Sequence, residues 1–266
     1  MTLSNGQVKD ASIDSPVLGQ KMKYRVYLPP GYDDPRFANT RYPVVYLLHG
    51  APGGMHDWVD GGSANQTADA LIKTRTIQPI IIIMPDGSLD DPHHDTQWGN
   101  SPVTGERVED ALIQDLLPAM DQTYRTLPGK DERAIGGLSA GGYGAVNIAL
   151  HHPEAFSVAF SLSGYFLPEL TYDGHDIWGS DAARTHNTPL ANVAQQALHI
   201  QIIQASDEGD SFVQAGQFDQ ALTQHGIDHE FLRIDGQGHS WDFWRDHLLD
   251  ALKYTNRFFG AAQPGH

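Results

Sequence analysis

The stretch Gly137-Leu138-Ser139-Ala140-Gly141 follows a short predicted strand at residues 133–136 and precedes a predicted helix at residues 142–151. A serine at the centre of G-x-S-x-G, between a strand and a helix, is typical of a nucleophile held on a tight, strained turn. Glycine on either side lets strand and helix approach without colliding side chains. The stretch therefore predicts an α/β fold with Ser139 as nucleophile, and the alternative is a Gly-rich helix start that only packs closely against a sheet.

The residues before this stretch alternate between predicted strands and helices. A strand at 23–28 ends at Pro29-Pro30-Gly31, and we expect it at a sheet edge. Short, continuous apolar runs at 44–48 and 80–84 indicate strands buried on both faces of a parallel sheet. Helices are predicted at 64–74 and, from the apolar spacing, at 108–123.

The residues after the stretch continue the same alternation. Predicted strands lie at 158–162, 200–205 and 231–234, and predicted helices at 212–224 and 241–259. Residues 163–197 show little periodicity and indicate an excursion or small cap over the active face. Strands that alternate with helices imply right-handed crossovers and a mainly parallel sheet. The length of 266 residues fits one domain over residues 1–266.

Composition excludes several classes of function. The chain has 40% hydrophobic residues, a formal net charge of −16 and no basic stripe, so nucleic acid is not an expected partner. No apolar run approaches the length of a membrane-spanning helix. The absence of cysteine excludes disulfides, thiolate metal sites and a cysteine nucleophile. The polar residues 1–10 predict no signal peptide, so a cytoplasmic protein and an exported one with its signal removed both fit.

A serine nucleophile needs a histidine base, and His239 has the expected position. In hydrolases with this serine motif the base comes last in the chain, after the final strand. The loop Gly236-Gln237-Gly238 can carry the His239 imidazole back over the serine. His247, on the following helix, is the rival and is expected to be a solvated helix residue.

The third member of such a triad is a carboxylate that orients the imidazole and stabilises its charged form. Its expected place is the loop after strand 200–205. Asp207, Glu208 and Asp210 all lie there. The residues alone do not choose among the three.

Acyl transfer also needs backbone N–H donors for the oxyanion. Ala140, directly after the nucleophile, is expected to supply one, and Ala51, in the Gly-rich loop after strand 44–48, the other. This loop lacks the lysine and glycine pattern of a phosphate-binding loop.

No metal or organic cofactor is implied. The acidic and histidine-containing run at residues 90–95 could bind zinc or calcium, but it has no helical metal-ligand spacing and is expected to be a solvated loop. Four tryptophans near strand ends could line a pocket or pack the loops down: Trp58, Trp98, Trp178 and Trp241.

The motifs together resemble the esterase D and antigen 85-like group of α/β-hydrolases, which includes S-formylglutathione hydrolases, feruloyl, acetyl-xylan and siderophore esterases and mycolyltransferases. The resemblance covers residues 23–259 and rests on the segments 42–50, 84–87, 116–118, 124–125, 134–145, 152–156 and 238–244. It implies an α/β-hydrolase fold, Ser139 as nucleophile, His239 as base, and oxyanion donors at Ala51 and Ala140.

The family pattern also bears on the acid, through a Gly-x-x-Asp followed two places on by an aromatic residue or leucine. Asp210-Ser211-Phe212 matches its tail but lacks the glycine, whereas proximity to the strand favours Asp207 or Glu208. Asp210 is the preferred choice.

The predicted function is therefore a serine carboxylesterase that acts through an acyl-enzyme on a small-molecule, glycan or lipid ester. The same triad would serve an acyltransferase of the mycolyltransferase type. A catalytically silent binding module on the hydrolase scaffold is the third hypothesis. The oligomeric state stays open.

Overall fold

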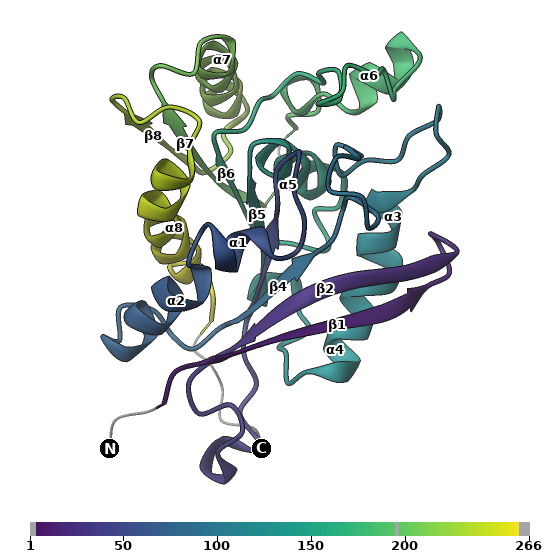
Figure 1. Cartoon of the computed structure of the whole chain (residues 1–266). Helices are drawn as coiled ribbons and strands as arrows, with labels where there is room; N and C mark the ends of the chain where they lie inside the picture. The colour runs from purple at the N-terminus through teal and green to yellow at the C-terminus, as the bar shows by residue number, and fades with distance from the viewer. Residues whose placement is uncertain (1–3, 195–196, 261–266) are drawn as a thin grey trace.

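The fold is built on one eight-stranded sheet (Figure 1), and the computed structural model describes residues 4–194 and 197–260. The strand order is β1-β2-β4-β3-β5-β6-β7-β8. Strands β1, β2 and β4 pair antiparallel, and every pair from β4 to β8 is parallel. The strands are β1 (Gln7–Ser15), β2 (Gln20–Leu28), β3 (Val44–Leu48), β4 (Ile81–Pro85), β5 (Arg133–Leu138), β6 (Val158–Leu162), β7 (His199–Ala205) and β8 (His229–Ile234). The predicted α/β fold with a mainly parallel sheet is confirmed.

Helices cover both faces of the sheet (Figure 1). One face packs against α1 (Asp57–Asp60), α2 (Ala64–Lys73) and α8 (Trp241–Asn256). The other packs against α3 (Val108–Ala111), α4 (Leu117–Thr123), α5 (Ala140–His151) and α7 (Asp210–His225). The remaining elements are α6 (Asp181–His186), the π-helical turn η2 (Leu112–Leu116) and the 3₁₀ turns η1 (Pro35–Phe37), η3 (Lys130–Glu132) and η4 (Pro189–Ala191).

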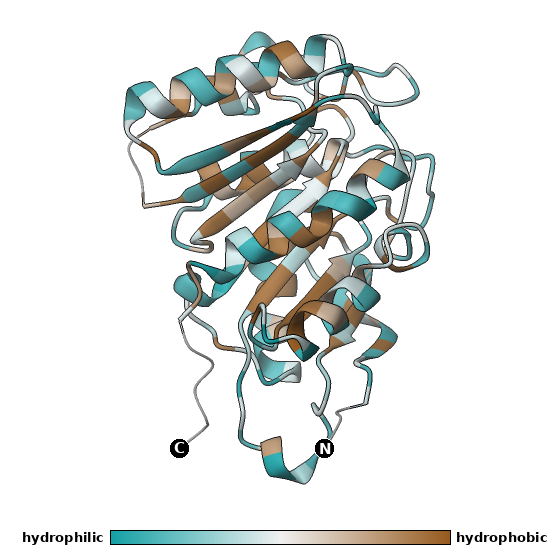
Figure 2. Cartoon of the chain, turned by 90° about the vertical axis from the view of Figure 1, so that its left-hand side faces the viewer, coloured by the Kyte–Doolittle hydropathy of each residue, from teal (hydrophilic) through white to brown (hydrophobic). Residues whose placement is uncertain are grey.

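Strands β3 and β4 are continuous apolar runs because both of their faces are buried. In β3, Val44 and Tyr46 join the core under α5, whereas Val45 and Leu47 join the core under α8. Alternate side chains of a strand point to opposite faces, so a strand between two helical layers has no polar face. Figure 2 shows these apolar strands enclosed between helices that carry polar residues.

The expectation that strand 23–28 lies at a sheet edge is wrong. Strand β2 lies between β1 and β4, and β1 forms the edge. Strand β1 escapes prediction because its residues are mostly polar and at least partly exposed, with few apolar residues to set a period. Charged side chains are a common protection for such an edge.

The helix predicted at 108–123 is present but contains a π-helical turn, η2, between α3 and α4. Pro118 lies in the first turn of α4. A proline inside a helix lacks the N–H and collides with the carbonyl one turn earlier. The wider turn immediately before Pro118 relieves that conflict.

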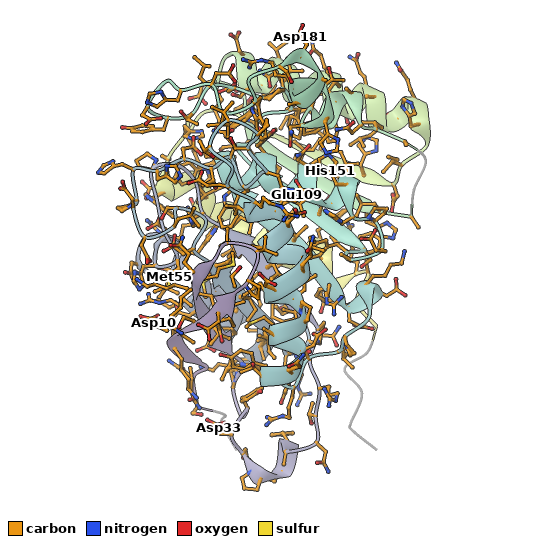
Figure 3. The ribbon with its side chains drawn as sticks, turned by 90° about the vertical axis from the view of Figure 1, so that its right-hand side faces the viewer. Asp10, Asp33, Met55, Glu109, His151 and Asp181 are labelled. Carbon is orange, nitrogen blue, oxygen red and sulfur yellow. The ribbon has the colours of Figure 1, made fainter. Side chains whose placement is uncertain are left out.

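The segment predicted as an excursion, residues 163–197, connects the end of β6 to the start of β7. The structure describes all of it except residues 195 and 196. The segment contains α6 and is anchored to the body by a histidine pair. The His186 ring stacks on His151, with 4.3 Å between ring centroids. Glu109 of α3 accepts hydrogen bonds from His151 (2.8 Å) and His152 (2.9 Å), and Figure 3 labels Glu109 and His151. This cluster ties the segment to the end of α5, the helix that begins directly after Ser139.

Candidate active site

Ser139 lies on the turn between β5 and α5 with φ 53° and ψ −123°. The turn depends on its glycines. A Cβ on Gly141 would lie 2.4 Å from the carbonyl oxygens of Leu48 and His49, and one on Gly137 would lie 2.5 Å from the Gly141 backbone. Real Cβ atoms do not approach backbone this closely, so the strained turn requires glycine on both sides.

His239 follows β8, and the structure brings it to Ser139. Its Nε2 lies 2.9 Å from the Ser139 Oγ, a hydrogen-bond distance. Residues Gly236, Gln237 and Gly238 all have positive φ, which folds the chain back over the sheet. Ser240 then caps α8, because its side chain accepts a hydrogen bond from the Phe243 N–H. The His239 ring also packs edge-on against Trp244, with 4.9 Å between centroids.

Of the three loop carboxylates, all of which the structure describes, only that of Glu208 lies within 4.0 Å of the His239 ring. The Oε1 of Glu208 is 3.8 Å from the His239 Nδ1, and the Glu208 side chain is 3% exposed. Asp210, the preferred choice from the sequence, is instead the exposed first residue of α7. Asp207 accepts a hydrogen bond from the Gly238 N–H (3.2 Å) and so braces the histidine loop.

The rival histidine, His247, lies elsewhere on α8. Its Nδ1 pairs with Asp250 at 3.0 Å, one turn along the same helix. Its side chain is 15% exposed and packs against Phe243, so it is largely buried rather than solvated as expected.

The loop after β3 carries Gly50 and Ala51, and the buried His49 fixes its orientation. The Gly87 N–H donates to the His49 Nε2 (2.9 Å), so the proton is on Nδ1, which donates to the Gly50 carbonyl (2.8 Å). Burial lowers the pKa of His49 and keeps it neutral. In a trans peptide the N–H points opposite to the C=O, so the Ala51 N–H points away from His49.

Ala140 is the first residue of α5. The first N–H groups of a helix have no partner within the helix, so that of Ala140 is available to an anion. Ala140 follows Ser139 directly in the chain, and Ala51 and Ser139 line the same cavity.

A cavity of about 580 Å³ opens at these groups. Its lining comprises Gly50, Ala51, Pro52, Gly53, Asp57, Pro92, Leu138, Ser139, Tyr172, His239, Ser240, Trp241 and Trp244. Among these lining residues of the described structure there is no lysine or arginine. Tyr172 comes from the excursion, and its backbone N–H donates to the buried Asp95 carboxylate (2.9 Å). The excursion therefore supplies a wall of this cavity.

The four tryptophans considered as pocket or packing residues have two different roles: one lines the cavity and three pack the loops. Trp241 lines the cavity. Trp58 and Trp98 are buried and donate their indole N–H groups to the carbonyls of Leu48 (2.8 Å) and His49 (3.0 Å), so they fix the end of β3. Trp178 is fully buried and packs in a loop core with Tyr165.

The side chains of the acidic and histidine-containing run 90–95 contact separate partners and do not converge on one point. Asp90 pairs with Lys23 (2.7 Å) and His94 with Glu106 (2.8 Å). Asp95 is buried, unlike the solvated residue expected, because it holds the excursion. Within the described ranges no group of three or more His, Asp or Glu side chains has the geometry to hold a metal ion. Over the same ranges, no helix is long and apolar enough to cross a membrane.

The model of a family described as "Putative esterase" matches residues 15–255. An endo-1,4-β-xylanase/feruloyl esterase of Xylanibacter ruminicola is 34% identical over 170 residues, which are 63% of this chain and 23% of that protein. The chain spans between 23% and 55% of the length of the first three curated relatives it matches.

Two solved structures have the same architecture. A ferulic acid esterase has a TM-score of 0.83 at 24% identity, with 96% of this chain and 99% of that chain covered. An S-formylglutathione hydrolase from Agrobacterium tumefaciens has a TM-score of 0.80 at 20% identity, with 96% of each chain covered. At this level of identity the likeness establishes the fold, and the predicted α/β-hydrolase fold is confirmed.

Proposed function

The chain belongs to the esterase family whose model spans residues 15–255, and from this membership and the site geometry we propose that it is a serine carboxylesterase. The observation that carries the proposal is the 2.9 Å contact between the Ser139 Oγ and the His239 Nε2 at the floor of a cavity. A serine hydroxyl becomes an effective nucleophile only with a base at this distance.

The reaction proceeds in two steps. His239 takes the Ser139 proton as the Oγ attacks the ester carbonyl, and the N–H groups of Ala51 and Ala140 hold the oxyanion. The alcohol then leaves with the proton from His239, and an acyl-enzyme remains. His239 next deprotonates a water molecule, which attacks the acyl carbon, and Ser139 recovers its proton as the acid departs.

We assign the acid of the triad to Glu208. Its carboxylate faces the His239 Nδ1, the nitrogen that keeps its proton while Nε2 acts as base. The distance of 3.8 Å is longer than a hydrogen bond, and such contacts often tighten only when the imidazole becomes charged. Asp207 and Asp210 are then not part of the triad: Asp207 has the bracing role described above, and Asp210 is an exposed charge in the first turn of α7.

The lining of the cavity favours a neutral ester with a flat, apolar group as the substrate. Trp241 and Tyr172 offer aromatic surfaces, and the lining carries an acidic side chain, Asp57, but no cation. An anionic substrate would therefore meet repulsion without a compensating partner. The names of the relatives, among them feruloyl and ferulic acid esterases, agree with an aromatic ester as substrate.

The test is a fluorophosphonate label located by mass spectrometry, together with turnover of a panel of p-nitrophenyl esters. We expect the label on Ser139 and loss of turnover in Ser139→Ala. Label at another residue, or undiminished turnover in that variant, would overturn the proposal. Addition of hydroxyl acceptors to the assay separates hydrolysis from transfer, because free acid must remain the main product if water is the acceptor.

A further inference from the structure

Ser163 lies at the carboxyl end of β6, the strand between the one that precedes Ser139 and the one that precedes Glu208. Its side chain is not part of the proposed triad, yet it is buried among the triad's supports. The Ser163 Oγ donates a 2.6 Å hydrogen bond to the Oε1 of Glu208, the same oxygen that faces His239.

The carboxylate of Glu208 is thereby held at both oxygens. Ser163 donates to Oε1, and the Gln204 side-chain amide donates to Oε2. A carboxylate that is 3% exposed needs such donors, because a buried charge without hydrogen bonds is strongly destabilising. Each carboxylate oxygen has two acceptor positions, so the bond from Ser163 leaves one on Oε1 for the His239 Nδ1–H.

Ser163 is itself fixed in place. The Trp244 indole N–H donates to the Ser163 Oγ (2.9 Å), which directs the hydroxyl proton toward Glu208. The Ser163 backbone N–H donates to the Ile203 carbonyl (2.9 Å). Its φ of 53° is unfavourable for a residue with a side chain, and such strain in native proteins is concentrated at functional sites.

These contacts form one chain from Trp244 through Ser163, Glu208 and His239 to Ser139. Trp244 closes it into a ring, since its indole also packs edge-on against the His239 imidazole.

We propose that Ser163 is a positioning residue for the reaction, which holds the Glu208 carboxylate against the His239 Nδ1. The inference rests on the proposed serine esterase function. The Ser163 Oγ bonds both to Glu208 and to Trp244, which lines the cavity, so the KM and the Glu208→Gln background are needed to separate an effect through Glu208 from one through the cavity wall.

The chain offers a matched control in Ser161. It lies two residues earlier on β6, is fully buried, and its Oγ has no hydrogen-bond partner among the described residues. Ser161→Ala and Ser163→Ala therefore remove the same kind of atom from buried positions two residues apart, and only the second removal frees Glu208.

The experiment measures kcat and KM for p-nitrophenyl acetate in Ser163→Ala, Ser161→Ala, and Ser163→Ala combined with Glu208→Gln. Because a hydrogen bond to a charged group is lost, we expect Ser163→Ala to lower kcat about tenfold or more with KM nearly unchanged. Ser161→Ala should stay within about twofold of the parent protein, and Ser163→Ala should cost less than about twofold in the Glu208→Gln background.

Two outcomes would overturn the inference. One is equal kcat in the two single alanine variants, and the other is a full, additive loss in the Glu208→Gln background. If Ser163→Ala does not fold, Ser163→Gly replaces it, since glycine suits a φ of 53° and also lacks the hydroxyl. Full activity in Ser139→Ala would instead defeat the serine esterase function itself, which keeps the two failures distinct.

Discussion

Replacement of Glu109 by glutamine should destabilise the protein strongly near pH 6 and much less near pH 9. Burial alone would raise the Glu109 pKa, but the hydrogen bonds from His151 and His152 outweigh it and lower the pKa from 4.5 to about 2. This lowering corresponds to about 3 kcal/mol in the free energy of unfolding. A glutamine oxygen still accepts one of the two hydrogen bonds, so we expect a loss of about 2 kcal/mol.

The pH window follows from the directions of the three pKa changes. The lowered Glu109 pKa stabilises the fold above about pH 4.5, and this contribution disappears as the pH falls through about 2. Burial lowers the His151 pKa, but its bond to Glu109 outweighs that effect, and for His152 the bond to Glu109 is the largest effect. Because both histidine pKa values are raised, the two histidines stabilise the folded state below about pH 6.5, and this stabilisation is lost as the pH rises through their raised pKa values.

The assay is urea unfolding followed by tryptophan fluorescence at the two pH values. Glu154→Gln is the matched control, because Glu154 also contacts His152 (3.3 Å) but is 68% exposed, and exposed ion pairs contribute little. An equal loss in the free energy of unfolding for Glu109→Gln at pH 6 and pH 9 would refute the electrostatic reasoning. The loss would then have to come from altered packing around residue 109.

Three further predictions concern the site. Glu208→Gln should lower kcat about a hundredfold or more, since the acid orients the base, whereas Asp210→Asn should stay within about threefold; equal losses in steady-state assays would contradict the assignment. Gly141→Ala should lower the free energy of unfolding by more than about 2 kcal/mol, because its Cβ would lie 2.4 Å from two carbonyl oxygens, and an unchanged urea midpoint would argue against the strained turn. Tyr172→Ala should raise KM for a bulky aryl ester about threefold or more and leave KM for acetate unchanged, and a parallel rise for both would show that Tyr172 does not select the substrate.

Ser139 and His239 could be placed from the sequence because local chemistry constrains both. The strained turn at Ser139 admits only glycine at two positions, and the loop before His239 needs residues that accept positive φ. Such requirements leave a pattern in the sequence itself.

The acid could not be placed in this way. Asp207, Glu208 and Asp210 lie within four residues of one another, and which of them turns inward depends on contacts made far away in the chain. Glu208 is selected by its hydrogen bond with Ser163, 45 residues earlier. Strand β1 escaped prediction for a related reason, since its pairing with β2 rather than its own apolar pattern makes it a strand.

The excursion between β6 and β7 has a consequence for how such proteins diverge. These two strands pair directly and in parallel, so the segment leaves the sheet at the carboxyl end of β6 and crosses over to the amino end of β7. The proposed triad of Ser139, Glu208 and His239 and both proposed oxyanion donors lie outside residues 167–194, whereas Tyr172 lies within them. Insertions or exchanges in this segment can therefore reshape one wall of the cavity, and with it the range of esters that fit, without altering the residues proposed to carry out the hydrolysis.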